Sequence, residues 1–122
     1  EAGSLKKEMK RIKRSASLED TIFITLEELI TGPISYKLKN IFPIEGRIQG
    51  IFTQDERVYI NLSREFILFI NAENEKHIIL SLLETIAYNF KSMREVVLLF
   101  NNRRMHHISG AYVLERPFTI RK

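Results

Sequence analysis

The sequence predicts an α+β fold, with a small sheet of about four to five strands and two helices packed on one face of it. Apolar residues recur at steps of three and four over residues 17–31 and 75–90, which is the period of a helix. Residues 47–53, 57–62 and 95–101 are short β-branched runs bounded by turn residues, as strands are. The core order is therefore αββαβ, and each helix needs a flat apolar partner for its apolar stripe.

The chain of 122 residues has the length of one domain. It contains no cysteine, which excludes disulfides and thiolate metal sites, and no run approaches the ~18 apolar residues of a membrane span. We divide the chain into a basic N-terminal arm or edge strand over residues 1–16 and a single domain over residues 17–122. Residues 1–4 (EAGS) resemble a cloning remnant, and a lipid anchor would have to precede them.

The positive charge of the chain is concentrated in the arm. Residues 1–14 carry six basic and two acidic side chains, whereas the other 108 residues carry 13 of each sign. Leu5, Met9 and Ile12 recur at helical spacing, but the same stretch also suits an edge strand protected by Lys and Arg, which is the interpretation that we prefer. A nucleic-acid module usually has a basic face on its folded body as well, and the balanced body does not predict one.

The first predicted helix covers residues 17–31. Ser17 and Asp20 have the spacing of a capping box, with Asp in place of the usual Glu. The TIFIT segment inside it favours a strand by propensity alone. The helical period and the following Gly32-Pro33 stop decide for a helix, because Gly suits the position after a helix and Pro cannot continue one.

Two strands then follow a loop over residues 34–46 and are joined by a turn over residues 54–56. In the second strand apolar and polar residues alternate, which predicts that one face lies toward the core. Residues 63–70 are mainly apolar. They fit either a short helical turn capped by Ser63 or a loop that covers the core.

The central helix is predicted over residues 75–90, with Leu82 and Leu83 among its core side chains. We expect Asn74 to cap its N-terminus and Glu75 to lie on its polar surface. Only four residues separate this helix from the next strand, so the two elements form a tight unit.

The end of the strand over residues 95–101 carries a turn signal. Asn101 and Asn102 tolerate positive φ, which predicts a tight turn and a returning strand over residues 103–108. The tail contains Pro117, which suits an edge strand or a loop.

No set of residues predicts catalysis. His106 and His107 are adjacent, so in a strand they point to opposite faces, and a metal site would need distant carboxylates or His77. Ser63 ends an apolar strand but lacks the Gly-x-Ser-x-Gly elbow of a nucleophile. Three glutamates lie on polar helix faces, where solvation is the normal state: Glu27, Glu28 and Glu84. We therefore expect a protein that is not an enzyme, with no cofactor and no metal.

Basic and aromatic residues are the candidates for an interaction surface. The arm suits lipid head groups, nucleic acid or anionic wall polymers, or else a solvated linker near a membrane anchor. Exposed phenylalanines would mark a partner surface, and two arginines form a smaller basic spot beside the histidine pair. The candidates are Lys6, Lys7, Lys10, Arg11, Lys13 and Arg14 in the arm, Phe66 and Phe69 in the apolar stretch, and Arg103 and Arg104.

Four stretches, taken in order, resemble the GerMN domain, which occurs in sporulation and spore-germination lipoproteins and in other bacterial envelope proteins. They are LEELITGP at 26–33, RVYINLSREF at 57–66, LSLLETIAYNF at 80–90 and REVVLLFNNRR at 94–104. The resemblance covers about residues 5–118, and the order of the motifs is more specific than any one of them. The turn over residues 54–56 departs from the Asp-Gly that the family often has there.

The resemblance implies an αββαβ core like that of a ring-building motif. It also implies an extracytoplasmic, membrane-tethered module that contacts another envelope protein and brings no known catalytic mechanism. An anionic membrane surface or a cell-wall polymer stays open as a further partner, and so does oligomerisation. The rival interpretations are a nucleic-acid-binding module that uses the basic arm and a peptidoglycan-binding accessory domain. A KH domain shares the element order, but the five glycines contain no Gly-x-x-Gly pair, which argues against nucleic acid.

Overall fold

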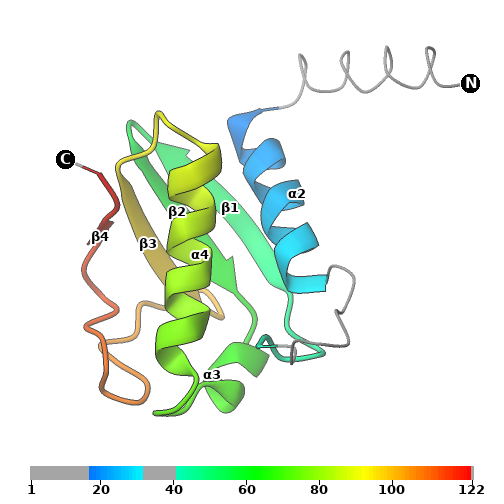
Figure 1. Cartoon of the computed structure of the whole chain (residues 1–122), viewed down its shortest axis with the longest axis vertical. Helices are drawn as coiled ribbons and strands as arrows, with labels where there is room; N and C mark the ends of the chain where they lie inside the picture. Colours follow the sequence, from blue (N-terminus) through cyan, green and yellow to red (C-terminus); the bar gives the residue numbers. More distant parts are fainter. Residues whose placement is uncertain (1–16, 32–40, 122) are drawn as a thin grey trace, which may run out of the picture.

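The computed structural model describes residues 17–31 and 41–121 of the chain. The elements are α2 (Leu18–Thr31), β1 (Ile48–Gln54), β2 (Arg57–Leu62), α3 (Glu65–Phe69), α4 (Glu75–Asn89), β3 (Glu95–Phe100) and β4 (Phe118–Thr119). The strands form one four-stranded sheet, α2 and α4 lie on the same face of it, and α3 lies beyond one end (Figure 1). The predicted α+β fold, with two helices on one face of a small sheet, is confirmed.

The sheet has the strand order β1-β2-β3-β4. β1 and β2 form an antiparallel hairpin, β2 and β3 pair in parallel across the connection through α3 and α4, and β4 adds a short antiparallel edge. The parallel register runs from Arg57 opposite Glu95 to Leu62 opposite Phe100. Because side chains alternate between the two faces of a strand, this register places them in rows that cross the sheet.

α2 begins with the predicted capping box. The backbone N–H of Asp20 donates to Oγ of Ser17 at 3.1 Å, and the N–H of Ser17 donates to Oδ2 of Asp20 at 3.4 Å. This exchange satisfies N–H groups that a helix start would otherwise leave without partners. The buried residues of α2 lie one turn apart, as the helical period predicts: Ile22, Leu26 and Ile30.

Two predictions fall on residues that lie outside the described part of the chain. They are the edge strand over residues 5–16 and the helix stop at Gly32-Pro33. Residues 41–46, the last part of the predicted loop, do form a loop that leads into β1.

Residues 63–70 contain the short helix α3, which is the first of the two alternatives. Ser63 does not cap this helix, since α3 has no side-chain cap. Phe66 is completely buried and packs edge-to-face against Phe42, with 6.5 Å between the ring centroids. The same ring lies so close to Gly46 that a Cβ at that position would be 2.7 Å from Cε1 of Phe66.

α4 is the central helix, and Leu82 and Leu83 are buried in it as predicted. The expected cap at Asn74 is wrong, because its side chain points back into the preceding turn. Oδ1 of Asn74 accepts a hydrogen bond from the N–H of Asn71, and Nδ2 donates to the carbonyl of Phe69. The amide thus joins the start of α4 to the last carbonyl of α3 and does not cap α4.

The surface position predicted for Glu75 is also wrong. Its side chain is completely buried, with 0% of its surface exposed, at the first turn of α4. Oε1 of Glu75 accepts a hydrogen bond from Oγ of Ser109, a residue of the long segment that follows β3. The periodicity of the helix could not reveal this partner because it comes from a distant part of the sequence.

The turn after β3 is confirmed, but the strand that should follow it is wrong. Asn101 and Asn102 have φ values of 53° and 69°, as a two-residue turn of this kind requires. Only a single bridge, between Phe100 and Arg103, extends the ladder beyond the turn. Residues 104–117 have no regular secondary structure and cross to β4.

Candidate functional site

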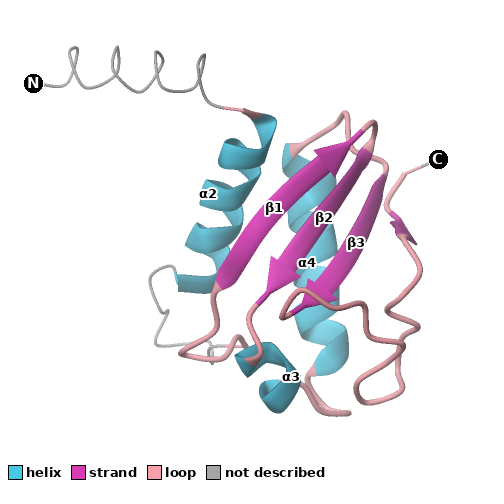
Figure 2. Ribbon diagram, turned by 180° about the vertical axis from the view of Figure 1, so that it is seen from behind, coloured by secondary structure: helices cyan, strands magenta, loops and turns pink. Residues whose placement is uncertain are grey.

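The face of the sheet opposite to α2 and α4 is the candidate site. Figure 2 shows this face from the front, with no described helix over β1, β2 and β3. The register brings three rows of side chains onto it, and we call them together the open face. The rows are Gly50, Asn61 and Leu99, then Phe52, Tyr59 and Val97, then Gln54, Arg57 and Glu95.

The middle row of the open face is apolar. Phe52 pairs with Tyr59 in register, and their ring centroids are 5.7 Å apart with the planes tilted by 50°. Phe52 exposes 57% of its surface, whereas Val97, opposite Tyr59 in the register, is completely buried. Val97 does not belong to the core between the sheet and the helices, so a second and smaller apolar layer exists on this side.

Charged side chains border the apolar row at the end of the sheet where the β1–β2 hairpin turns. Nε of Arg57 donates to Oε1 of Glu95 at 2.8 Å across the parallel pair, and Nη1 of Arg57 donates to the hydroxyl of Tyr59 at 3.3 Å. These hydrogen bonds, first to Tyr59 and then to Glu95, raise the pKa of Arg57 above its ordinary value. Arg57 thus links the aromatic pair to the charged row.

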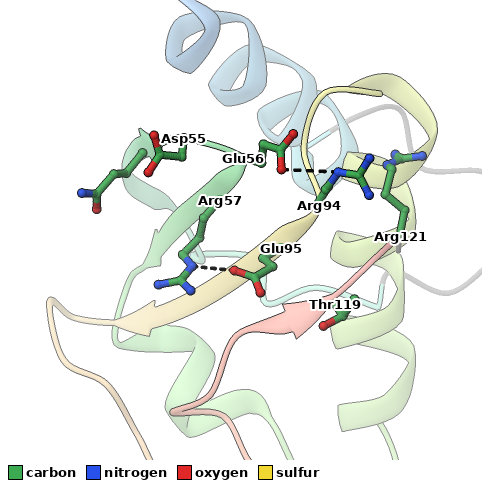
Figure 3. A pocket seen from close by; sticks show the side chains of 8 residues that line it. Asp55, Glu56, Arg57, Arg94, Glu95, Thr119 and Arg121 are labelled. Atoms are coloured by element: carbon green, nitrogen blue, oxygen red, sulfur yellow. Dashed lines mark hydrogen bonds and ion pairs between the residues drawn. The ribbon is translucent and has the colours of Figure 1, made fainter.

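A pocket of about 500 Å³ opens at this end of the sheet (Figure 3). Besides the ion pair of Arg57 with Glu95, it contains a second pair in which Nε of Arg94 is 3.3 Å from Oε1 of Glu56. The lining residues are Gln54, Asp55, Glu56, Arg57, Arg94, Glu95, Thr119 and Arg121. Three arginines and three carboxylates therefore face one hollow.

Arg121 is held in place by the end of the central helix. Its Nε donates to the carbonyl of Met93 at 2.8 Å, and its Nη2 donates to the carbonyls of Ala87 and Phe90. Helix ends leave carbonyl groups without intrahelical partners, and a cation there is also favoured by the helix dipole. The C-terminal tail thereby caps α4 and presents a fixed guanidinium group to the pocket.

The interaction residues predicted from the sequence are not gathered in one place. Phe66 is wrong as a surface residue, because it is buried in the core under Gly46. Phe69 is partly buried and packs against the same core. Arg103 and Arg104 are exposed after β3. The six basic residues of the arm lie outside the described part of the chain.

The histidine pair, His106 and His107, does not lie in a strand, and both rings have contacts in the structure. Nδ1 of His106 lies 2.7 Å from Oε1 of Glu115, and the rings of His106 and His107 pack edge-to-face with centroids 5.0 Å apart. Among the residues that the structure describes, no three His, Asp or Glu side chains converge as metal ligands would. His106 therefore joins two parts of the segment before β4, and the ring of His107 packs against it.

Ser63 is buried in a structural network. Its Oγ accepts a hydrogen bond from the N–H of Arg47 at 2.9 Å, and its N–H donates to the carbonyl of Arg47 at the same distance. A hydrogen bond from Ser63 is also the main cause that lowers the pKa of Glu65. These contacts fix the start of β1 against the end of β2, which is the role of a turn hydroxyl.

The sequence did contain a signal for the open face. Phe52 and Tyr59 alternate with the core residues of their strands, so these strands have apolar residues on both faces. This pattern is typical of a strand whose two faces are both covered. A β-bulge between Ile48 and Gly50 adds one residue to β1. The alternation of side chains between the two faces shifts at this point, so the pattern is difficult to recognise in the sequence of β1. The pairing with β3 cannot be read from sequence at all, because the strands are joined by a long crossover.

The fold and the open face define a class of protein, a mixed α+β domain in which no described helix covers one face of the sheet. The family model described as Germane, for sporulation and spore germination, matches residues 3–106. The chain therefore belongs to this family, and the resemblance stated from the sequence motifs is confirmed. Comparison with curated protein sequences gives no match.

Solved structures share the fold. A Clostridium perfringens protein described as a candidate lipoprotein superposes with a TM-score of 0.73 at 24% identity, covering 83% of this chain and 68% of its own. The first GerMN domain of the sporulation protein GerM from Bacillus subtilis gives 0.60 at 24% identity, with 75% and 71% covered. The tandem GerMN domains of GerM give 0.63 at 20% identity, and the match covers 77% of this chain and 34% of that one. In the described residues, no helix has the length and apolar character needed to cross a membrane.

Proposed function

We propose that this chain is a non-enzymatic interaction domain of a bacterial envelope protein of the sporulation or germination type. It acts outside the cytoplasm, tethered to a membrane, and binds another envelope protein through the open face. Membership of the Germane family supports the biological setting. The similar structures from a candidate lipoprotein and from a sporulation protein support the location.

The exposure of Phe52 on the open face is the observation that carries the proposal. Protein interfaces combine an apolar or aromatic centre with a polar rim. The tilted pair of Phe52 and Tyr59 supplies such a centre, and the charged row that contains Arg57 and Glu95 supplies a rim. The sheet also holds these groups rigidly, which lowers the entropy cost of binding.

A second exposed apolar patch lies beside α3 and is the alternative surface. Ile44 and Leu68 are more exposed than Phe52, at 85% and 75%, and line a shallow hollow with Phe69. They belong to a loop and a five-residue helix and carry no aromatic pair or ion pair. We therefore prefer the open face and use Leu68 as the comparison position.

The charge of the folded body favours a protein partner over a nucleic acid. α2 carries two acidic residues in its first turn and no basic residue in its last turn. Nucleic-acid binding depends mainly on phosphate contacts from basic side chains. The arm, with Lys6–Arg14, is the basic part of the chain, and near an anionic membrane each such residue contributes roughly 1 kcal/mol.

The proposal is tested by replacing one exposed side chain on each surface in the cells that make the protein. Phe52→Ser should lower the efficiency of sporulation or germination while the protein still accumulates outside the cytoplasm at its normal level. Leu68→Ser is the matched control and should have no effect. Normal efficiency with Phe52→Ser, or turnover of peptidoglycan by the purified domain, would contradict the proposal.

A further inference from the structure

We propose that the pocket at the hairpin end of the sheet binds a carboxylate of an acidic protein segment, which replaces Glu56 on Arg94. This inference rests on the proposed function, because it describes the chemistry of the partner. The pocket and the open face share Arg57, whose Nη1 contacts the hydroxyl of Tyr59. A partner seated on the aromatic pair would therefore lie next to the pocket at Arg57.

The pocket has more N–H donors than it uses. Arg94 engages Glu56 through Nε alone, and Arg121 uses Nε and Nη2 on backbone carbonyls. Within the described residues, the two Nη atoms of Arg94 and the Nη1 of Arg121 have no protein acceptor. Both guanidinium groups lie at the same end of the pocket (Figure 3). Adjacent forked donors are suited to a planar carboxylate.

The backbone around these donors is fixed. The carbonyl of Glu56 accepts hydrogen bonds from the N–H of Arg94 at 2.8 Å and from the N–H of Glu95 at 3.1 Å. The N–H of Ile120 donates to the carbonyl of Arg94 at 2.8 Å, which brings Arg121 beside it. The hairpin tip, the start of β3 and the tail therefore fix the backbone at both arginines, which reduces the ordering needed on binding.

The ion pair between Arg94 and Glu56 is the one that a ligand can replace. Its atoms are 3.3 Å apart, and 63% of the Glu56 side chain and 46% of the Arg94 side chain are exposed. Exposed pairs of this kind contribute little stability, so an incoming carboxylate loses little by displacing Glu56. The pair of Arg57 with Glu95 is shorter, at 2.8 Å, and less exposed, so we expect it to stay intact.

The charge of the pocket favours a carboxylate over a phosphate. Asp55, Glu56 and Glu95 face the same hollow as the three arginines, and the pocket is neutral as a whole. A doubly charged phosphate is repelled by these carboxylates more strongly than a singly charged group is. Displacing Glu56 leaves one uncompensated arginine, which one carboxylate neutralises.

The test is an NMR titration of the whole chain that follows the Nε–H signals of its arginines. The probe is the peptide acetyl-Ala-Glu-Ala-amide, with acetyl-Ala-Gln-Ala-amide and methyl phosphate as comparisons. We expect a saturable shift of Arg94 with the glutamate peptide, none with the glutamine peptide, and weaker binding of methyl phosphate. Arg121, whose guanidinium group lies beside that of Arg94, should shift as well, and Arg94→Ala should abolish this shift.

Glu56→Gln gives the sharpest result because it removes the internal competitor. It should tighten binding of the glutamate peptide about two- to fivefold, the range that corresponds to an exposed ion pair. Glu84→Gln on the exposed surface of α4 and Arg64→Ala before α3 are matched controls that should leave the affinity unchanged. Unchanged or weaker binding with Glu56→Gln would overturn the exchange, and tighter binding of methyl phosphate would reassign the pocket to phosphate-bearing polymers.

The peptide titration and the Phe52→Ser experiment test the carboxylate pocket and the proposed partner surface separately. If the peptide does not bind while Phe52→Ser still lowers sporulation or germination, the open face keeps its role and the carboxylate pocket is wrong. If Phe52→Ser has no effect while the peptide binds, the pocket stands and the proposed partner surface is wrong.

Discussion

Ser109 donates a hydrogen bond to the buried carboxylate of Glu75, although the two residues are 34 positions apart in the sequence. Glu75 begins α4, and Ser109 belongs to the irregular segment between the Asn101-Asn102 turn and β4. The other carboxylate oxygen, Oε2, has no hydrogen-bond partner among the described residues. Since a buried carboxylate is costly to leave without hydrogen bonds, this contact holds the segment against the central helix.

We predict that Ser109→Ala destabilises the fold and loosens residues 104–117. The substitution leaves a completely buried carboxylate without its donor, and such a loss costs about 1–3 kcal/mol. Urea unfolding measures the change in free energy, and amide hydrogen exchange shows where protection is lost.

The matched control is Ser92→Ala, since Ser92 is exposed in the turn after α4. We expect no change of stability from it. Equal stabilities for the two variants, or an exchange pattern for Ser109→Ala that spares residues 104–117, would show that the hydrogen bond does not hold this segment.

Gly46 and Gly50 differ in the space around them, and this difference gives a second prediction. A Cβ at Gly46 would lie 2.7 Å from both Phe66 and Pro43, whereas a Cβ at Gly50 would meet no atom within 4 Å. Gly46→Ala should therefore destabilise the domain by about 1–3 kcal/mol, the usual cost of overpacking. Gly50→Ala should change the stability little.

Thermal and urea unfolding of both variants measure this difference. Equal stabilities of Gly46→Ala and Gly50→Ala would contradict this prediction. Phe66 would then have room to move and would not be fixed in the core.

The elements with strong periodicity were predictable from sequence. The capping residues Ser17 and Asp20 and the stripe of α4 around Leu82 are set by nearby residues, so local patterns predict them. The positive φ of Asn101 and Asn102 was predictable for the same reason, since the turn depends only on its own side chains.

The wrong predictions concern residues whose partners come from distant parts of the sequence. Glu75 occupies a polar position of the helix, and only the return of the chain at Ser109 buries it. Phe66 was a candidate for exposure from the sequence, whereas in the fold it packs against Phe42 and lies close to Gly46. The pocket was missed entirely, because Arg57, Arg94 and Arg121 meet only through the β2–β3 pairing and the capping of α4.

The hydrogen bond from Ser63 predicts how one carboxyl affects stability. It lowers the pKa of Glu65 below the ordinary value of 4.5. A group whose pKa is lower in the folded state contributes stability above its unfolded pKa, and this contribution is lost as the pH falls through the folded pKa. The destabilisation caused by Ser63→Ala should therefore be larger at neutral pH than in acid, as measured by urea unfolding at both pH values.

Repeating the comparison in a Glu65→Gln background isolates this carboxyl. In that background the cost of Ser63→Ala should no longer depend on pH, because the remaining loss is the uncharged contact with Arg47. A pH dependence that persists without Glu65 would assign it to another group.

Photo-crosslinking from residue 52 shows whether the open face contacts a partner protein. A photo-crosslinking amino acid, benzoylphenylalanine, is placed at position 52 or, in a separate strain, at position 68, and the cells that make the protein are irradiated. If the open face is the contact surface, position 52 gives a discrete crosslinked product with one envelope protein and position 68 gives none. Crosslinking from position 68 with none from position 52 would contradict the account.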